Sequence, residues 1–373
     1  MKNILLLIII LIFSLASCSQ KTKEIVVEKP IESVSLLFMG DIMGHSPQIN
    51  AAYNKVTKKY NYDDVFAKVA PIIQSVDFAI ANLEVTLAGK PYKGYPQFSS
   101  PNALANACKK SGIDVLVTSN NHSCDRGKKG ILRTIKTLDS LKIKHTGTFK
   151  DSTERANNNL LVLHKNNIKI GILNYTYGTN GMPIPKPTLV NLIDKEQMLV
   201  DITASKKDSL DKLIVFIHWG NEYKTKPSTA QEETAKYLFD NGVDIIIGSH
   251  PHVLQRMEYI QADEKNKEKL IAYSLGNFVS NQRKIDRDGG AMLRLTLSKK
   301  EDKISISDYG YYLVWVDKTT IDKKNKYEIF PCSYYTGNGF FSMDSISKKN
   351  MDIFTKNSRK LLKADNILIK EIK

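Results

Sequence analysis

The sequence feature that most constrains the fold is a series of short apolar runs, most of which end in a polar side chain. "VDIIIGSH" ends at His250, and "LIVFIHWG" contains His218. The runs of the same kind elsewhere are "VSLLFMGD", "FAIANLE", "DVLVTSNNH", "KIGILNY" and "LIAYSLGNF". Runs this short, this apolar and this rich in β-branched residues are typical of strands that are buried on both faces of a parallel sheet.

Amphipathic segments separate these runs. Apolar residues recur at helical intervals in residues 63–74 and 127–141. Residues 228–240 begin with a cap-like "STAQEE", in which the offset between Ser228 and Glu232 favours a helix start. The alternation of buried strands with helices predicts an α/β protein with a largely parallel core.

The last third of the chain has a different pattern. "AMLRLTLS", "KISISDYGYYLVWVD" and "KYEIFPC" follow one another with no helical segment between them, which predicts antiparallel strands. Residues 345–363 then have the spacing of an amphipathic helix. We therefore expect one domain over residues 34–330 and a C-terminal extension over residues 331–373 that contains this helix.

The N-terminal residues have the pattern of an export signal. Lys2 precedes an apolar run from Ile4 to Phe13, which is shorter than the roughly 20 residues that span a membrane. The following "LASC" resembles the lipobox of bacterial lipoproteins, and this resemblance implies that Cys18 becomes the lipidated N-terminus of a protein anchored in the cell envelope. We expect residues 1–18 to be the signal peptide and residues 19–33 to be a polar tether. The alternatives are ordinary signal cleavage and an uncleaved anchor.

The charge balance bears on the partners. Lysine and arginine outnumber the acidic residues 54 to 39, so the formal net charge is +15. Such a charge favours anionic partners, namely nucleic acid, anionic lipid or an acidic polymer, although a lysine-rich solvated surface explains it equally well. No nucleic-acid motif accompanies the charge, and we expect no nucleic-acid partner. The three cysteines after Cys18 match no zinc pattern and predict no disulfide framework.

Side chains that can bind metals stand at the carboxyl ends of the predicted strands. They are Asp41, Glu84, Asn121, His218, His250 and His252. A single carboxylate after a strand is more often a helix cap, and a single histidine is more often structural. Because ligands bind where the carboxyl ends of the strands meet in an α/β sheet, however, a whole set in these positions predicts a shared metal site. Oxygen and imidazole ligands without thiolate suit Mn, Fe or Zn.

Six motifs, in this order, are similar to those of the CapA family of bacterial capsule-synthesis proteins, which serve poly-γ-glutamate biosynthesis. They are "FMGDIM", "ANLEVTL", "TSNNHSCDRG", "FIHWGNEY", "GSHPHVLQ" and "YSLGNF", and they cover about residues 34–280. "NYTYGTNGMPIPKP" also resembles a segment that the family inserts between metal motifs. The family belongs to the calcineurin-like metallophosphoesterase superfamily. The resemblance therefore implies a four-layer α/β/β/α sandwich with a dinuclear metal centre.

The resemblance also implies a role for each ligand. Asp41 would bind the first of two divalent transition-metal ions. Glu84 would bridge both ions, at a position where the superfamily usually has aspartate. The remaining ligands would be Asn121 and His218 on the second ion, and His250 and His252 with one ion each.

The first motif departs from the superfamily pattern. The usual motif is Asp-x-His, but here Asp41 is followed by Ile42 and Met43. His45 lies four positions after Asp41 and is not an obvious replacement. The departure implies that the first ion has fewer protein ligands and is bound more weakly.

Two further residues have an implied catalytic role. His122 follows the asparagine ligand, where the superfamily places a general acid or a group that stabilises the transition state. Two metal ions can activate water and bind the oxygens of a reacting centre. His122 would then protonate a leaving group or stabilise developing charge. Asp125 would orient the His122 imidazole, or instead cap the helix that begins near Gly127.

Other side chains near the expected site are candidates for substrate contacts. Glu222 and Tyr223 belong to the "HWGNEY" motif, and Asn277 stands near the end of the last apolar run. Tyr175 and Tyr177 would line a specificity loop. Packing of turns explains each of these five residues equally well.

Two functions are compatible with these residues. The first is a metal-dependent hydrolase of the cell envelope that cleaves a phosphoester, or an amide of an anionic polymer such as poly-γ-glutamate, beside capsule-synthesis membrane proteins. The second is a non-catalytic factor that binds the polymer for export or assembly. The set of ligands and His122 favour the enzyme. The altered first motif, the basic charge and the lipid anchor favour the binding factor.

Overall fold

The computed structural model describes residues 31–263, 267–335, 343–365 and 368–373. Cys18, the predicted signal peptide and most of the predicted tether lie outside these residues. The chain from Ile31 to Lys373 belongs to one compact unit. All that follows concerns this unit.

Its larger sheet is built around β1, which is antiparallel to one neighbour and parallel to the other. In spatial order the strands are β18 (Lys324–Pro331), β17 (Lys303–Ile321), β16 (Gly289–Lys300), β1 (Glu32–Ile42), β4 (Phe78–Leu83), β5 (Val115–Val117) and β6 (Lys144–Thr146). Two short strands extend it, β15 (Asn277–Val279) beside β1 and β19 (Lys370–Glu371) beside β17. From β1 to β6 the strands are parallel, so their carboxyl ends lie at one edge.

The smaller sheet has a parallel centre between two antiparallel edge strands. Its strands, in spatial order, are β13 (Met257–Ile260), β14 (Lys269–Ala272), β12 (Ile245–Ser249), β11 (Lys212–His218), β9 (Ile168–Thr176) and β8 (Leu161–Lys165). Two small pairs lie outside the main sheets, β2 (Tyr53–Asn54) with β3 (Lys59–Tyr60) and β7 (Thr148–Phe149) with β10 (Leu189–Val190). The predicted parallel strands are therefore divided between two sheets.

Helices connect the strands and cover the outer faces. They are α1 (Ser46–Ala52), α2 (Asp63–Phe66), α3 (Ala70–Ile73), α4 (Asn102–Ser111), α5 (Gly127–Ser140), α6 (Ser152–Asn158), α7 (Lys195–Ser205), the 3-10 turn η1 (Lys206–Asp208), α8 (Thr229–Asp240), α9 (Cys332–Tyr335) and α10 (Ser345–Asp365). The helix at 127–141 was predicted almost to the residue.

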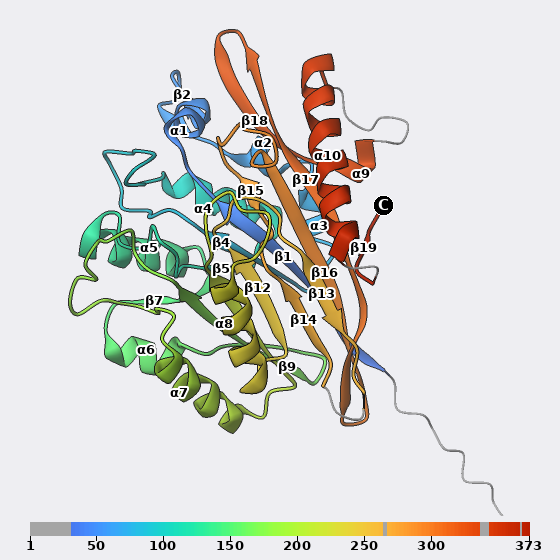
Figure 1. Ribbon diagram of the computed structural model, residues 1–373. Coiled ribbons are helices and arrows are strands. Elements are labelled where there is room, and N and C mark those ends of the chain that lie inside the picture. Colours follow the sequence, from blue (N-terminus) through green and yellow to red (C-terminus); the bar gives the residue numbers. More distant parts are fainter. Residues whose placement is uncertain (1–30, 264–266, 336–342, 366–367) are drawn as a thin grey trace, which may run out of the picture. The chain divides into compact units, whose positions relative to one another are not determined.

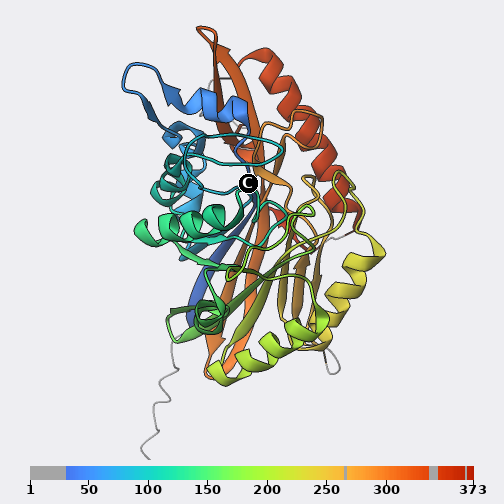
Figure 2. The same cartoon turned by 90° about the vertical axis from the view of Figure 1, so that its left-hand side faces the viewer.

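Alternating side chains of the strands fill three separate apolar layers. In β1, Leu36 and Phe38 point into a core between the two sheets, whereas Leu37 and Met39 point into a core shared with α2, α3 and α4. Strands β9, β11 and β12 send their alternate residues into a third core with α7 and α8. Figure 2 shows both sheets between the blue-green helices on one side and the yellow-green helices on the other. The order of layers is helix, sheet, sheet, helix, and the predicted α/β/β/α sandwich is confirmed.

The C-terminal part adds antiparallel strands to the larger sheet, as the sequence pattern predicts. β16, β17 and β18 pair in succession with antiparallel register. The helix predicted at 345–363 is α10, which runs alongside β17 (Figure 1). Its Met351 and Phe354 enter the core between the sheets, and β19 pairs with β17. The predicted C-terminal extension, residues 331–373, therefore also packs into the main core.

Two local predictions need correction. The continuous helix expected at 63–74 is two short helices, α2 and α3, because Pro71 cannot donate an N–H and its ring would clash with the preceding turn. The start of α8 is capped by Ser228 as predicted, but its reciprocal partner is Gln231 and not Glu232. The third helical position faces the cap, so Gln231 has the geometry of a capping box.

No described helix is long and apolar enough to cross a membrane. The cysteines that the structure describes, Cys108, Cys124 and Cys332, are buried and free.

Close packing against the backbone determines which residue can stand at position 248, near the end of β12. A Cβ added at Gly248 would lie 2.0 Å from the Tyr273 carbonyl oxygen and 2.6 Å from the Trp219 indole nitrogen. Both neighbours are buried, and Trp219 already donates to that carbonyl at 3.0 Å. Only glycine fits between them, so the residue that opens the "GSHPH" turn is set by packing.

We expect Gly248→Ala to lower the free energy of unfolding by about 1–3 kcal/mol or to prevent folding, because the methyl group would force backbone apart. Urea denaturation of the purified protein measures this. Gly178→Ala is the matched control, since a Cβ there meets no atom within 4 Å, and it should change stability by less than about 0.5 kcal/mol. Equal stabilities for the two variants would contradict the packing argument.

Candidate metal centre

The strand ends of both sheets bring the predicted ligands to one place. Asp41 is the penultimate residue of β1, and Glu84 directly follows β4, its parallel neighbour. His218 is the last residue of β11 and lies in register with Ser249 at the end of β12. His250 directly follows β12. Since these strands end at facing edges of two packed sheets, residues that are far apart in the sequence meet there.

Glu84 lies at the centre of this group. Donor atoms of Glu84, His250 and His252 lie within 4.8 Å of one another, and so do those of Asp41, Glu84 and His218. One Glu84 oxygen is 3.6 Å from His218 Nε2 and 3.7 Å from His252 Nε2. All five side chains are buried. Glu84 is therefore shared by two overlapping sets of ligands.

Asp41 is held by groups on both sheets. Its Oδ2 lies 3.2 Å from His252 Nδ1 and accepts the His250 N–H at 3.3 Å. Its Oδ1 accepts the Asn82 amide at 2.8 Å, and that amide nitrogen is also 3.2 Å from His218 Nδ1. The Asp41 carboxylate thus ties the two sheets together at their common edge.

The central carboxylate lacks a hydrogen-bond donor. Both oxygens of Glu84 and Nδ1 of His250 are buried without a hydrogen-bond partner in the part of the chain that the structure describes. A buried carboxylate with no donor is strongly unfavourable, because it has lost its hydration and gained nothing in return. A bound cation would remove that penalty. These residues therefore fit a metal ion on the strength of their own chemistry.

The shifted pKa values of the site also fit a bound metal ion. Burial raises the pKa of Glu84 well above its usual value, and the neighbouring Asp41 raises it further. Burial lowers the pKa of His218 well below 6.5 and lowers that of His250 to about 3. The imidazoles are therefore neutral at physiological pH, which is the form that binds metals.

The turn that carries His250 and His252 has an unusual backbone. Their φ angles are 98° and 56°, a left-handed region that residues with a Cβ seldom occupy. Such strain persists only where the surrounding structure holds it in place, and it concentrates at functional sites. The turn directs both rings toward Glu84, with ring centroids 5.9 Å apart.

Asn121 and Tyr177 close one side of the group. Asn121 Oδ1 lies 3.0 Å from His218 Nε2, and its amide donates to Asn180 at 3.3 Å. The Tyr177 ring is 4.6 Å from the His250 ring and is partly exposed. The structure therefore places Asn121 beside His218 and Tyr177 beside His250.

His122 and Asp125 form a buried pair next to these ligands. His122 Nδ1 lies 2.7 Å from Asp125 Oδ2, and the same oxygen accepts the Phe98 N–H at 2.6 Å. The Phe98 ring meets the His122 imidazole edge-on at 4.6 Å. The N-cap of α5 is Arg126, whose side chain makes no capping bond. Of the two alternatives for Asp125, the structure shows the contact with His122.

The whole constellation can now be compared with known proteins. The chain matches the family described as "Bacterial capsule synthesis protein PGA_cap" over residues 35–282. The chain belongs to this family. All the ligand residues named above lie within the matched region.

Two curated relatives carry names of the same kind. Capsule biosynthesis protein CapA of Bacillus anthracis is 31% identical over 295 residues, which are 75% of this chain and 68% of that protein. PGA biosynthesis protein CapA of Bacillus subtilis (strain 168) is 28% identical over 256 residues, which are 67% of this chain and 64% of that protein. The match to the second relative thus spans less than two thirds of its length.

Solved structures with a similar chain path include, by title, an NAD nucleotidase and a calcineurin-like phosphoesterase. NAD nucleotidase (NadN) of Haemophilus influenzae has a TM-score of 0.49 and 13% identity, covering 89% of this chain and 61% of that chain. Calcineurin-like phosphoesterase YfkN of Bacillus subtilis has a TM-score of 0.44 and 15% identity, covering 89% and 99%. At such identities the likeness concerns the fold and not the substrate.

Two of the predicted substrate contacts of this PGA_cap protein do not reach the site. Tyr175 is fully buried in the core with α7 and donates its hydroxyl to Asp201 at 2.8 Å, because alternation along β9 points it away from the other sheet. Asn277 is also fully buried, and its amide is used by protein groups. It donates to the Arg287 carbonyl at 2.7 Å, and its oxygen lies 3.1 Å from His252 Nδ1. The structure thus shows Asn277 in contact with His252 and the Arg287 backbone.

Glu222 and Tyr223 lie at the border of the site. The Tyr223 N–H donates to the Pro251 carbonyl at 2.7 Å, between the two histidines of the strained turn. The Tyr223 ring is 6.1 Å from the His252 ring and is half-buried, whereas Glu222 is exposed. Tyr223 therefore lies next to the turn that carries His250 and His252.

Sequence reasoning missed three residues that shape the site. Asn82 holds Asp41, and Asn120 donates to Asn82 at 3.1 Å and to the Leu83 carbonyl at 2.8 Å. The signal for Asn82 was a polar residue inside an otherwise apolar run, two positions before Glu84. His45 caps α1, and its ring meets Phe98 edge-on at 5.3 Å. No pattern in the sequence marks that contact.

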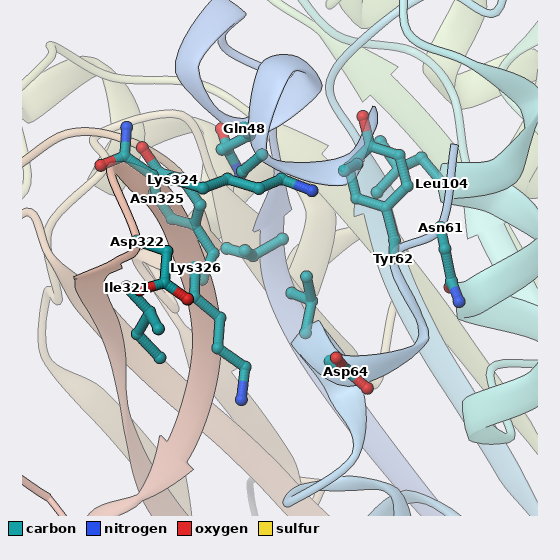
Figure 3. Close-up of a pocket in the computed structure, with 15 residues that line it drawn as sticks. Gln48, Asn61, Tyr62, Asp64, Leu104, Ile321, Asp322, Lys324, Asn325 and Lys326 are labelled. Carbon is teal, nitrogen blue, oxygen red and sulfur yellow. The ribbon is translucent and has the colours of Figure 1, made fainter. Parts of the chain in front are cut away.

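A cavity of about 390 Å³ lies apart from the ligands, between α1, α2, α4 and the tip of the β17–β18 hairpin. Figure 3 shows Lys324 reaching across it, with Tyr62 and Leu104 on the opposite wall. The Lys324 ammonium donates to the Tyr53 carbonyl at 2.9 Å. None of the metal-site residues lines this cavity. The candidate metal ligands lie instead at the edge where the two sheets meet.

The raised pKa of Glu84 makes a prediction about stability without metal. A carboxyl whose pKa is raised on folding stabilises the fold below about pH 4.5, and this stabilisation is lost as the pH rises through the raised pKa. In the presence of a chelator, the parent should lose stability from this group as the pH rises above about 4.5, by at most about 1.4 kcal/mol per pH unit, while Glu84→Gln should not. Thermal unfolding at each pH measures the difference.

The lowered histidine pKa values act in the opposite direction, because they stabilise the fold above pH 6.5 and this is lost as the pH falls. They are present in both proteins, so the comparison measures the contribution of Glu84 together with its coupling to the neighbouring histidines. Glu233→Gln, at an exposed position on α8, is the control and should follow the parent. Adding Mn²⁺ should raise the melting temperature of the parent but not of Glu84→Gln. Parallel pH curves for parent and Glu84→Gln would contradict an uncompensated buried carboxylate.

Proposed function

We propose that this PGA_cap protein is a metal-dependent hydrolase of capsule biosynthesis that cleaves a phosphoester, or an amide of an anionic polymer, at the cell envelope. The observation that carries the proposal is the buried Glu84 carboxylate, without a donor among the described residues, next to the His122–Asp125 pair. A purely structural site would not leave such a carboxylate unpaired. A site for metal and substrate has a reason to do so.

Two divalent ions such as Mn, Fe or Zn fit the mixed oxygen and imidazole donors. The residues that would hold them are Asp41, Glu84, Asn121, His218, His250 and His252. When bound, the ions would supply a polarised scissile bond and an activated water. Asn82 and Asn277 would keep Asp41 and His252 in place through the contacts described above.

His122 is suited to transfer a proton. Asp125 Oδ2 already accepts the Phe98 N–H, so we assign the hydrogen between His122 and Asp125 to His122 Nδ1. This leaves Nε2 to exchange a proton with a leaving group. Asp125 then fixes the tautomer and the orientation of the ring and is a positioning residue. Both side chains are buried, which shields the exchange from bulk water.

The substrate class is supported by family and charge. The two curated relatives are named for capsule biosynthesis and for PGA biosynthesis. The net charge of +15 favours an anionic polymer over a neutral one. Capsule-synthesis membrane proteins are the partners that such a role would bring to the envelope.

A second function is favoured by one observation. Met43, at the position where the resemblance expects a histidine, is buried in the apolar core with α2 and α4 and cannot be a nitrogen ligand. A centre with fewer ligands would bind a polymer without cleaving it. The same experiment separates the two functions.

We expect His122→Ala to lower the rate of hydrolysis at least about 100-fold while leaving the metal content unchanged, because the proton donor is lost and the ligands are kept. Asp125→Asn should lower the rate less. The assay is release of nitrophenol from a nitrophenyl phosphodiester and of amine from a γ-glutamyl amide, with metal measured by mass spectrometry.

The matched control is His145→Ala, which removes a histidine paired with Asp139 at 3.1 Å on the α5 side of the larger sheet. It should retain the parent rate. If the parent holds two metal ions and cleaves neither substrate, the polymer-binding function replaces the enzyme. A parent that takes up no metal contradicts both proposed functions, because each assumes a metal centre.

We also propose that lipid on Cys18 anchors the protein, a residue that lies outside the described part of the chain. The support is the lipobox-like "LASC" in the sequence. In cells, Cys18→Ser should move the protein out of the detergent-extracted membrane fraction, and the parent should yield an acylated N-terminal peptide by mass spectrometry. Cys108→Ser, at a buried cysteine, is the control and should remain with the membrane. An unmodified Cys18 in membrane-bound parent would contradict the anchor.

A further inference from the structure

Arg287 has an unusual environment beside the metal ligands. Its guanidinium carbon lies 3.4 Å from the centre of the Tyr223 ring, so the two groups are stacked. Tyr223 is itself fixed, since its N–H donates to the Pro251 carbonyl and its φ angle is 65°. Pro251 lies between His250 and His252. The stack is therefore mounted on the turn that carries two metal ligands.

A second, independent contact ties Arg287 to the same place. Its carbonyl oxygen accepts the Asn277 amide at 2.7 Å. The oxygen of that amide group lies 3.1 Å from His252 Nδ1. Backbone and side chain of Arg287 are thus each linked to His252 through one intermediate residue, so the position of Arg287 relative to the metal ligands is well determined.

The guanidinium of Arg287 has no protein acceptor. Among the described residues it takes part in no hydrogen bond or ion pair, although it is half-buried. The other arginines all have an oxygen partner: Arg126, Arg133 and Arg283 bond backbone carbonyls, and Arg155, Arg256, Arg294 and Arg359 face carboxylates. Among the described arginines, Arg287 alone has no oxygen acceptor for its guanidinium N–H groups.

A stacked guanidinium presents its N–H groups in the plane, toward the edge of the ring. This arrangement suits two parallel hydrogen bonds to a carboxylate or a phosphate, and stacking lowers the entropy lost on binding. Asp286 and Asp288, on either side of Arg287, accept hydrogen bonds from Asn357 and Trp315 and not from the guanidinium. The Arg287 N–H groups therefore remain available to an anion.

We propose that Arg287, held flat on Tyr223, is the specificity-determining residue that binds an anionic group of the substrate, carboxylate or phosphate, beside the metal centre. The inference rests on the proposed function, and it names the group that selects the substrate. It predicts that the protein prefers substrates with an oxyanion next to the scissile bond over neutral analogues.

The test is the affinity of the metal-reconstituted protein for two probes, inorganic phosphate and glutarate, measured by isothermal titration calorimetry. Arg287→Gln should weaken binding of the preferred probe at least about tenfold, because charged, bidentate hydrogen bonds are lost. Arg287→Lys should restore only part of it, since an ammonium neither stacks nor binds with two parallel donors. The preferred probe tells whether the group is a phosphate or a carboxylate.

Lys284→Gln is the matched control, because it removes the same charge from an exposed position three residues away in the same loop. It should change the affinity less than about twofold. Equal losses in Arg287→Gln and Lys284→Gln, or no loss in Arg287→Gln, would overturn the inference. All variants should hold as much metal as the parent by mass spectrometry.

The outcomes separate this inference from the proposed function. A parent that holds metal but binds neither probe overturns the role of Arg287 and leaves the metal centre standing. A parent without metal overturns the proposed function. In that case a tenfold loss of anion binding in Arg287→Gln would still support the Arg287 site, and an unchanged affinity would overturn it as well.

Discussion

Glu84 follows β4 with both carboxylate oxygens buried and, among the described residues, without a donor. The surrounding groups are arranged around this feature. His218 and His250, whose pKa values are lowered by burial, face it from the smaller sheet, and the second buried carboxylate, Asp41, lies beside it. Two ionised carboxylates so close in a buried site repel each other, so either Glu84 keeps a proton, as its raised pKa indicates, or a cation lies between them. The fold therefore keeps an energetic cost at this edge that a cation relieves.

Rigid supports keep that arrangement from relaxing. Asn82 and Asn120 link the ends of β4 and β5 to Asp41, and Asn277 fixes His252. The strained backbone at His250 and His252 cannot relax, because Gly248 is packed against the Tyr273 carbonyl just before the turn. A side chain free to rotate would turn toward solvent and lose its position as a ligand. Asn82, Asn120 and Asn277 therefore support the candidate ligands without being ligands themselves.

Chemical roles divide along the border of the site. The His122–Asp125 pair lies on the α5 side, where Phe98 covers it, and the Tyr223–Arg287 stack lies beside the His250–His252 turn. One side is suited to move a proton and the other to bind an anion. A substrate held between them would be oriented by its charge, which is how an enzyme uses binding energy away from the reacting bond.

Local patterns in the sequence predict the helices and strands and the residues that stand at the strand ends. Short β-branched runs predict buried strands, helical spacing predicts α5 and α8, and the strand ends carry Asp41, Glu84, His218 and His250. These follow from periodicity and from the polarity of single positions, both of which are local. Features that depend on contacts between distant parts of the chain appear only in the tertiary structure. It divides the strands between two sheets, breaks the 63–74 helix at Pro71, turns Tyr175 toward α7 and uses Asn277 to hold His252. It also leaves Arg287 without an acceptor in the described chain while stacking it on Tyr223. Whether a polar group is satisfied depends on neighbours tens of residues away, and no local pattern contains that information.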